Sequence, residues 1–315
     1  MKTETALPTT LVGAIRYFAD PDVCREFVAN LRWPTGPVCP ECEGVEPSFL
    51  KTRRLWKCKA CKKQFSVKVG TIFEDSPIGL DKWLPALWMV VNCKNGVSSY
   101  EIARALGVTQ KTGWFMTHRI RLAMQTGTFK KFSGEVEIDE TFIGGRARFM
   151  HKRKRAKKIK GTGGVGKAAI MGLLERNGPD GHSIVRLKAI PTVRCAALLP
   201  EVQKQVVSGA EVFTDEWRAY KGLEADYIHK VIDHAEAYAE GKIHVNGLEN
   251  FWSLLKRAIK GTYVSVEPFH LFRYLDEQAY RFNARKTDDL RRFVRAVHGI
   301  AGKRIMYQDL IGQTA

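Results

Sequence analysis

The chain has 315 residues, 44% of them hydrophobic, which excludes a minimal stapled mini-protein and leaves enough length for two or three domains. Lys and Arg outnumber Asp and Glu by 51 to 33, and a polyanionic partner is the usual explanation for the resulting net charge of +18. The sequence contains no apolar run long enough for a membrane span and no features of a secretory signal. We therefore expect a cytoplasmic protein whose cysteines are reduced thiols or metal ligands.

An N-terminal helical segment is expected over residues 1–34, followed by a zinc ribbon over residues 35–73. Four of the seven cysteines form two CxxC pairs separated by fifteen residues, a spacing typical of a four-thiolate zinc site. The predicted zinc ligands are Cys39, Cys42, Cys58 and Cys61. Strands are predicted over residues 49–51, 54–57 and 64–69. Two unrelated thiol pairs are the alternative.

The predicted ribbon is strongly basic. Residues 51–70 contain eight Lys and Arg and no acidic residue. Its solvent-facing positions therefore present cations, for which phosphate is the natural counter-surface. A basic face that contacts only solvent is the alternative.

A helix-turn-helix is predicted over residues 80–128. Ser98 and Glu101 form a capping box for a short helix, and a tight turn at 107–109 leads into a second helix over 110–123. The second helix of such a motif enters the DNA major groove. Its exposed, DNA-binding positions are expected to include Lys111, Arg119 and Arg121, with Thr112, Thr117 and His118 also exposed. A helix pair that binds no DNA is the alternative.

An α/β domain is predicted over residues 133–290, followed by a C-terminal tail over 291–315. The hydrophobic pattern predicts strands over 135–139, 168–174, 183–190 and 210–215, with a helix over 196–207. Asp139 lies in the first strand and Asp215 closes the last. Because a carboxylate buried at a strand end costs free energy unless a cation compensates it, the two residues suggest a shared metal.

A long helix opening at His244 is predicted to carry a third carboxylate. Asn246, Glu249 and Lys256 share one polar stripe at helical spacing, while apolar residues fill the opposite face. We expect Glu249 to converge with the two strand carboxylates and Lys256 to meet a phosphate. Two divalent cations held in this way would suit phosphodiester chemistry. A chance trio among the 33 acidic residues is the alternative.

A basic run follows the first strand of the α/β domain. Residues 146–160 contain nine Lys and Arg, including Arg153 and Arg155, and no acidic residue. Such a run cannot pack into a core, so a loop that clamps DNA phosphates is predicted. A localisation signal or a solvated tether is the alternative.

Several segments together resemble a known family, the insertion-sequence transposases of the ISXO type. The resemblance runs from about Asp20 to Arg285. It is carried by the ribbon cysteines and by residues 137–145, 213–215, 244–257, 269–275 and 281–285. It implies an α/β, RNase H-like DDE catalytic domain preceded by a small zinc ribbon and a helical helix-turn-helix segment.

The resemblance also implies roles for particular residues and partners. Asp139 and Asp215 take the first two ligand positions for catalytic Mg²⁺ or Mn²⁺, in addition to the structural Zn²⁺. Glu249 is the expected third ligand and Asn246 the alternate, because some relatives carry asparagine in the third ligand position. Lys256 and Arg257 lie in the segment that would contact DNA. The implied partners are DNA, as element ends and target, and further copies of the chain, in a prokaryotic cytoplasm and on the nucleoid when bound.

We therefore predict a DNA transposase that cleaves and joins DNA with divalent metal. Two other functions fit the same pattern. A domesticated or inactive zinc-ribbon regulator would bind DNA without chemistry, and a metal-dependent nuclease of the same fold would cut without joining.

Overall fold

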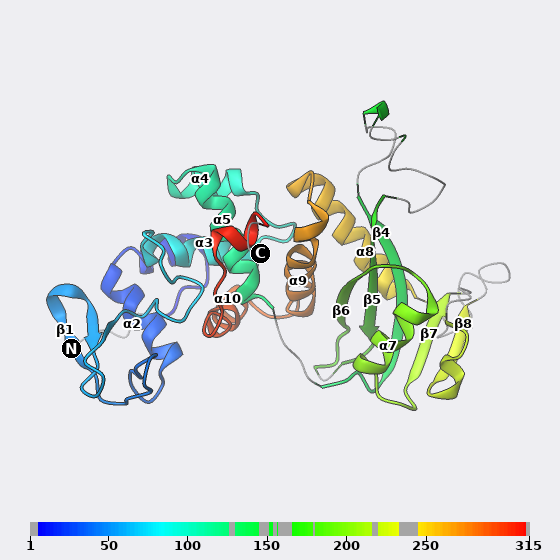
Figure 1. Ribbon diagram of the computed structural model, residues 1–315, viewed down its shortest axis with the longest axis horizontal. Coiled ribbons are helices and arrows are strands. Elements are labelled where there is room, and N and C mark those ends of the chain that lie inside the picture. Colours follow the sequence, from blue (N-terminus) through cyan, green and yellow to red (C-terminus); the bar gives the residue numbers. More distant parts are fainter. Residues whose placement is uncertain are drawn as a thin grey trace. The chain divides into compact units, whose positions relative to one another are not determined.

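The computed structural model describes residues 6–125, 130–144, 151–153, 156, 166–178, 180–215, 220–232 and 245–312. The chain forms two compact units, which are drawn in Figure 1. The first consists of Met1–Thr126 and Ala284–Ala315, and the second of Gly127–Asn283. None of the helices in the described residues is long and apolar enough to cross a membrane.

The ribbon in the first unit is a three-stranded antiparallel sheet in the order β1-β2-β3. The strands are β1 (Ser48–Leu50), β2 (Leu55–Lys57) and β3 (Gln64–Phe65), with the 3-10 turn η1 (Lys51–Arg53) between the first two. The third strand is shorter than predicted, because the backbone N–H groups of Val69 and Thr71 bond to Ser66 and Lys68 in turns. The side chains of Trp33, Trp56 and Phe65 pack edge-to-face or stacked and form the ribbon's small core.

Helices make up the rest of the first unit. They are α1 (Leu11–Tyr17), α2 (Pro21–Arg32), α3 (Leu80–Asn92), α4 (Ser99–Leu106), α5 (Gln110–Ala123), α10 (Asp289–His298) and α11 (Tyr307–Leu310). The predicted capping box starts α4: Glu101 N donates to Ser98 Oγ at 3.2 Å, and Ser98 N donates to Glu101 Oε2 at 2.7 Å. Gly107, at φ 61°, ends α4 in the left-handed conformation, and Thr109 caps α5.

The C-terminal residues belong to the first unit's core. The ring of Phe293 on α10 lies 5.0 Å from Trp88 on α3 and 5.8 Å from Phe27 on α2, measured between ring centroids. The segment expected as a tail thus supplies a buried aromatic residue to a core whose other aromatic residues lie more than 200 positions earlier in the chain.

The second unit is a mixed five-stranded sheet in the order β6-β5-β4-β7-β8. Its strands are β4 (Glu135–Ile143), β5 (Ala168–Glu175), β6 (Ile184–Ile190), β7 (Glu211–Asp215) and β8 (Ile228–Ile232). β4, β5 and β6 are antiparallel neighbours, while β7 runs parallel to β4 and β8. β8 is an addition to the four strands predicted.

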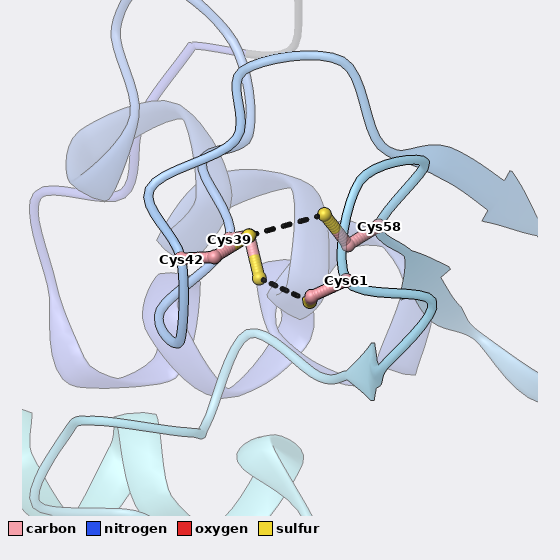
Figure 2. Close-up of side chains that lie close together, drawn as sticks. All are labelled: Cys39, Cys42, Cys58 and Cys61. Atoms are coloured by element: carbon pink, nitrogen blue, oxygen red, sulfur yellow. Dashed lines mark hydrogen bonds between the residues drawn. The ribbon is translucent and has the colours of Figure 1, made fainter.

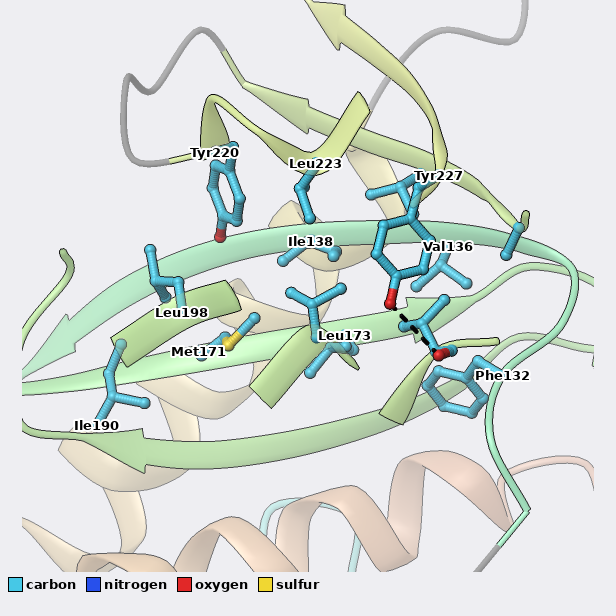
Figure 3. Packing of buried hydrophobic residues seen from close by; sticks show 14 of the residues in the cluster. Phe132, Val136, Ile138, Met171, Leu173, Ile190, Leu198, Tyr220, Leu223 and Tyr227 are labelled. Carbon is cyan, nitrogen blue, oxygen red and sulfur yellow. Dashed lines mark hydrogen bonds between the residues drawn. The ribbon is translucent and has the colours of Figure 1, made fainter. Parts of the chain in front are cut away.

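Alternating side chains on β5 divide the core between the two faces of this sheet. Met171 and Leu173 pack with α7 (Cys195–Gln205), as Figure 3 shows from close by. Ile170 and Leu174 pack with α8 (Asn246–Ala258) and α9 (Leu271–Asn283) on the other face. This period of two is the reason that consecutive apolar residues of one strand serve both layers.

Short irregular helices complete the second unit. They are η4 (Leu223–Ala225), the π-helical turn η5 (Ile259–Tyr263) and η6 (Pro268–His270). The sheet and its helices confirm the predicted α/β fold class, with the ribbon and the helical segment preceding it in the chain.

Candidate active site

The four predicted zinc ligands lie together in the ribbon (Figure 2). Their sulfur atoms all lie within 4.8 Å of one another, with 3.7 Å between Cys39 and Cys61 and 3.5 Å between Cys42 and Cys58. A Zn–S distance of about 2.3 Å places tetrahedral sulfurs about 3.8 Å apart. The four thiols therefore fit one zinc ion.

Two similar turns build this cluster. Cys39 N donates to Gly44 O at 2.9 Å, and Cys58 N donates to Lys63 O at 2.9 Å. The residue after each CxxC, Glu43 or Lys62, adopts a left-handed backbone with φ near 60°. The Cys61 backbone N–H is the main cause that lowers the pKa of Cys58 to about 7, which favours the thiolate that binds metal.

Two predicted carboxylates lie on neighbouring parallel strands. The parallel pairing of β4 with β7 runs up to Glu137 opposite Phe213, and Asp139 and Asp215 each follow two residues later on their strands. Adjacent strands are about 4.8 Å apart. The strand order, with β4 and β7 side by side at the centre of the sheet, is what brings two residues 76 positions apart to one edge.

Neighbouring groups shift the pKa of the Asp139 carboxyl in both directions. Burial is the largest cause that raises its pKa to about 6, and the charges of Asp215 and Glu249 contribute in the same direction. Hydrogen bonds from Trp252 Nε1 and Glu140 N, each 2.8 Å long, favour the ionised form. Since both other predicted carboxylates act on Asp139, the three form one electrostatic cluster.

Asp215 and Glu249 leave oxygen atoms open to a ligand. Asp215 Oδ1 is buried, and no group in the described part of the chain donates a hydrogen bond to it. Glu249 lies exposed in the first turn of α8, and Asn246 is the exposed first residue of that helix. Carboxylate oxygens are the ligands that Mg²⁺ and Mn²⁺ prefer, so this donor set fits such an ion.

The carboxylate site is more open than the ribbon. Within the described residues, the four cysteines form the only group of three or more ligand atoms that all lie within 4.8 Å of one another. A two-metal site spreads its ligands over ions about 3.5–4 Å apart, so wider spacing suits that arrangement.

Sequence reasoning did not single out Glu140, which lies beside Asp139 on the opposite face of β4. The hydroxyl of Tyr220 donates to Glu140 Oε1. Burial raises the pKa of Glu140 to about 7, with the Asp139 and Asp215 charges contributing. No local pattern distinguishes this glutamate, because its partner Tyr220 is 80 residues away.

The expectation that Arg119 and Arg121 are exposed was wrong. Their exposed fractions are 3% and 2%, and Thr117 and His118 are buried too. Arg119 Nη1 donates to the backbone carbonyls of Ile72 and Glu74 at 2.8 and 2.6 Å. These two arginines therefore hold the first unit together and do not present a DNA-binding surface. Lys111, in the first turn of α5, is exposed.

Basic side chains gather around a cavity near the end of β4. A cavity of about 540 Å³ is lined by Lys167, Lys256 and Lys260, together with Phe142. Lys256 is half-buried and Arg257 is exposed. Three ammonium groups on one cavity suit a phosphate. Of the predicted loop residues, Arg153 is exposed, and Arg155 lies outside the described residues, as does most of the 146–160 run.

A zinc ribbon ahead of a mixed sheet with carboxylates on neighbouring parallel strands is the arrangement that the resemblance to DDE transposases implies. The family of ISXO2-like transposase domains matches residues 131–283, and the transposase zinc-ribbon domain matches residues 20–64. The chain belongs to the ISXO2-like transposase family.

Two relatives are consistent with this assignment. An uncharacterized protein in transposable element ISH50 of Halobacterium salinarum is 27% identical over 255 residues, which cover 77% of this chain and 84% of that protein. An uncharacterized transposase-like protein of Haemophilus influenzae is 34% identical over 95 residues, which cover 30% of this chain and 76% of that protein. No solved structure matches the chain.

Proposed function

We propose that this insertion-sequence transposase binds the ends of its element and catalyses metal-dependent DNA cleavage and strand transfer. The observation that carries the proposal is the cluster formed by Asp139, Asp215 and Glu249. Two of these carboxylates lie on neighbouring parallel strands, the third acts on Asp139 from α8, and one buried oxygen of Asp215 has no donor among the described residues.

In the proposed mechanism, Asp139, Asp215 and Glu249 hold the divalent metal, and Asn246 assists or replaces Glu249. Bound Mg²⁺ or Mn²⁺ would activate a water or a 3′-hydroxyl and stabilise the leaving oxygen. Trp252 Nε1 and Glu140 N fix the direction of the Asp139 carboxylate through their hydrogen bonds. Burial of this carboxyl limits competition from water.

DNA would be bound by basic side chains on both units. On the ribbon, seven of the eight basic residues are exposed, whereas the Lys68 ammonium group donates to the carbonyls of Ser76 and Ile78. Lys111 on α5 and Arg153 add further cations, and Arg155 is proposed from the sequence alone. Lys256 and Arg257 would contact the DNA strand that lies nearest the carboxylates, since they follow Glu249 by about two helical turns.

The proposed partners are the terminal inverted repeats, target DNA and a second copy of the chain, because joining requires two element ends to be brought together. No membrane partner is proposed. We place this activity in a prokaryotic cytoplasm and, on binding DNA, at the nucleoid.

A strand-transfer assay with pre-cleaved element ends tests the proposal. Asp139→Asn and Asp215→Asn are expected to abolish product with Mg²⁺ or Mn²⁺, while DNA binding in a mobility-shift assay stays within about threefold of the unchanged protein. Product that persists in both variants would refute the metal-ligand roles.

The same assay, run also with uncleaved element ends, separates the other two functions. Cleavage without joined product by the unchanged protein would indicate a nuclease. DNA binding without either product would indicate a regulator.

A further inference from the structure

Two hydrogen bonds connect α8 to β4. Glu137 Oε2 accepts a bond from the backbone N–H of Leu248 at 2.9 Å, and Asp139 Oδ2 accepts one from Trp252 Nε1 at 2.8 Å. Residues two apart on a strand share a face, and residues four apart on a helix share a stripe. The two bonds therefore connect one face of β4 to one stripe of α8, with Glu249 between them in the sequence.

Two glycines allow the helix to lie this close to the sheet. A Cβ on Gly247 would lie 2.8 Å from Glu137 Oε2, and a Cβ on Gly172 would lie 2.6 Å from the Trp252 ring. Gly172 stands opposite Asp139 in the β4–β5 pairing. A larger residue at Gly172 would meet the Trp252 ring, and one at Gly247 would meet the Glu137 carboxylate, so either would disturb one of the two hydrogen bonds.

Glu137 is itself held in place. Its side chain is 1% exposed, and Arg176 Nε donates to Glu137 Oε1 at 2.7 Å. The Arg176 guanidinium lies 4.3 Å from the ring centroid of Phe213, which stands two residues before Asp215 on β7. One buried ion pair thus touches the strand of Asp139, the strand of Asp215 and the start of the helix of Glu249.

We infer that Trp252 and Glu137 are positioning residues, which fix the register of α8 on β4 and so hold Glu249 and Asp139 in the geometry that binds metal. A shift of α8 by one residue moves its side chains by about 1.5 Å along the axis and turns them by about 100°. Such a shift would remove Glu249 from the site. This inference rests on the proposed function, because it assumes that the three carboxylates bind a divalent cation.

The test measures Mn²⁺ binding to the zinc-loaded full chain by electron paramagnetic resonance, and thermal unfolding of the same samples. Asp139→Asn defines the signal of the proposed site. Trp252→Phe removes the indole N–H but keeps an aromatic ring, and it is expected to weaken Mn²⁺ binding at that site about tenfold or more. Phe251→Leu is the matched control, because Phe251 is buried next to Trp252 and its ring, which carries no hydrogen-bond donor, packs against Phe282.

Phe251→Leu is expected to lower the melting temperature while Mn²⁺ affinity stays within about twofold, since a packing defect alone leaves the two hydrogen bonds between α8 and β4 intact. Gly172→Ala, which displaces the indole without removing it, should weaken Mn²⁺ binding in the same direction as Trp252→Phe. If Trp252→Phe does not fold, the Mn²⁺ affinity of Gly172→Ala tests the inference in its place.

Equal Mn²⁺ affinity in the unchanged protein, Trp252→Phe and Gly172→Ala would overturn the positioning inference while leaving the proposed function intact. A different result, in which the unchanged protein binds no more Mn²⁺ than Asp139→Asn, would overturn the proposed metal site itself. The two failures are therefore distinguishable.

Discussion

The zinc ribbon and the carboxylate cluster are both sites suited to metal, but they are assembled over different lengths of chain. The four thiols come from residues 39–61 and two nearly identical turns. The three carboxylates come from β4, β7 and α8, at positions 139, 215 and 249. A site made by local turns depends on its metal to fold, whereas a site made by distant elements depends on a fold that already exists. This contrast sets the order of the effects expected below.

Removing zinc should have the largest effect. Metal analysis is expected to find about one zinc per chain, and Cys39→Ser should lose it and unfold the ribbon, because structural zinc contributes on the order of 10 kcal/mol to such small domains. Amide-exchange protection of residues 48–65 would report the loss. Protection of the second unit should be unaffected, and zinc-free protein with a protected ribbon would contradict the role of the ion.

Replacing the third carboxylate should be the next largest effect and affects chemistry without unfolding. Glu249→Gln is expected to slow strand transfer about 10³-fold, since a lost metal ligand removes several kcal/mol of transition-state stabilisation. Asn246→Ala, on the same helix turn, should cost about tenfold or less. The reverse ranking in single-turnover assays would make Asn246 the third ligand.

Replacing two basic residues of α5 should have different effects, one on stability and the other on DNA binding. Arg119→Ala is expected to destabilise the first unit by about 2–4 kcal/mol, because the carbonyls of Ile72 and Glu74 lose their donor. Lys111→Ala should change stability by less than about 0.5 kcal/mol but lower the salt dependence of DNA binding by about one ion. Denaturant unfolding and salt titrations measure the two effects. An Arg119→Ala protein of unchanged stability would contradict the structural role.

The smallest expected effect is on the pH dependence of stability without divalent metal. The folded-state pKa values of Asp139 and Glu140 are raised to about 6 and about 7, so the folded protein holds these protons more tightly than the unfolded chain. Their favourable contribution is present below about pH 4 and is lost as pH rises to about 7. We expect the free energy of unfolding to fall steadily across this range. Asp139→Asn should flatten the pH dependence of stability in thermal unfolding, and an unchanged slope would contradict a raised pKa of the Asp139 carboxyl.

The sequence predicted the ribbon and the α4–α5 pair well because their signals are local. The CxxC turns, the Ser98–Glu101 capping box and Gly107 each act within a few residues. It predicted the carboxylates as candidates by their strand and helix positions, but their spatial relation depends on β4 and β7 being neighbours in the sheet. Helical spacing alone placed Arg119 and Arg121 on the surface, since it could not anticipate the segments that cover the second half of α5.

By itself the sequence determined the four cysteines that fit a zinc ion, the main helices and strands, and the family to which the chain belongs. Thiol spacing, caps and hydrophobic periodicity are properties of neighbouring residues and need no distant partner. Only the tertiary structure decided which arginines are buried, that residues 284–315 complete the first unit, and that Glu137, Trp252, Gly172 and Gly247 hold α8 against β4. Each of these features depends on contacts between elements far apart in the chain, which local patterns do not encode.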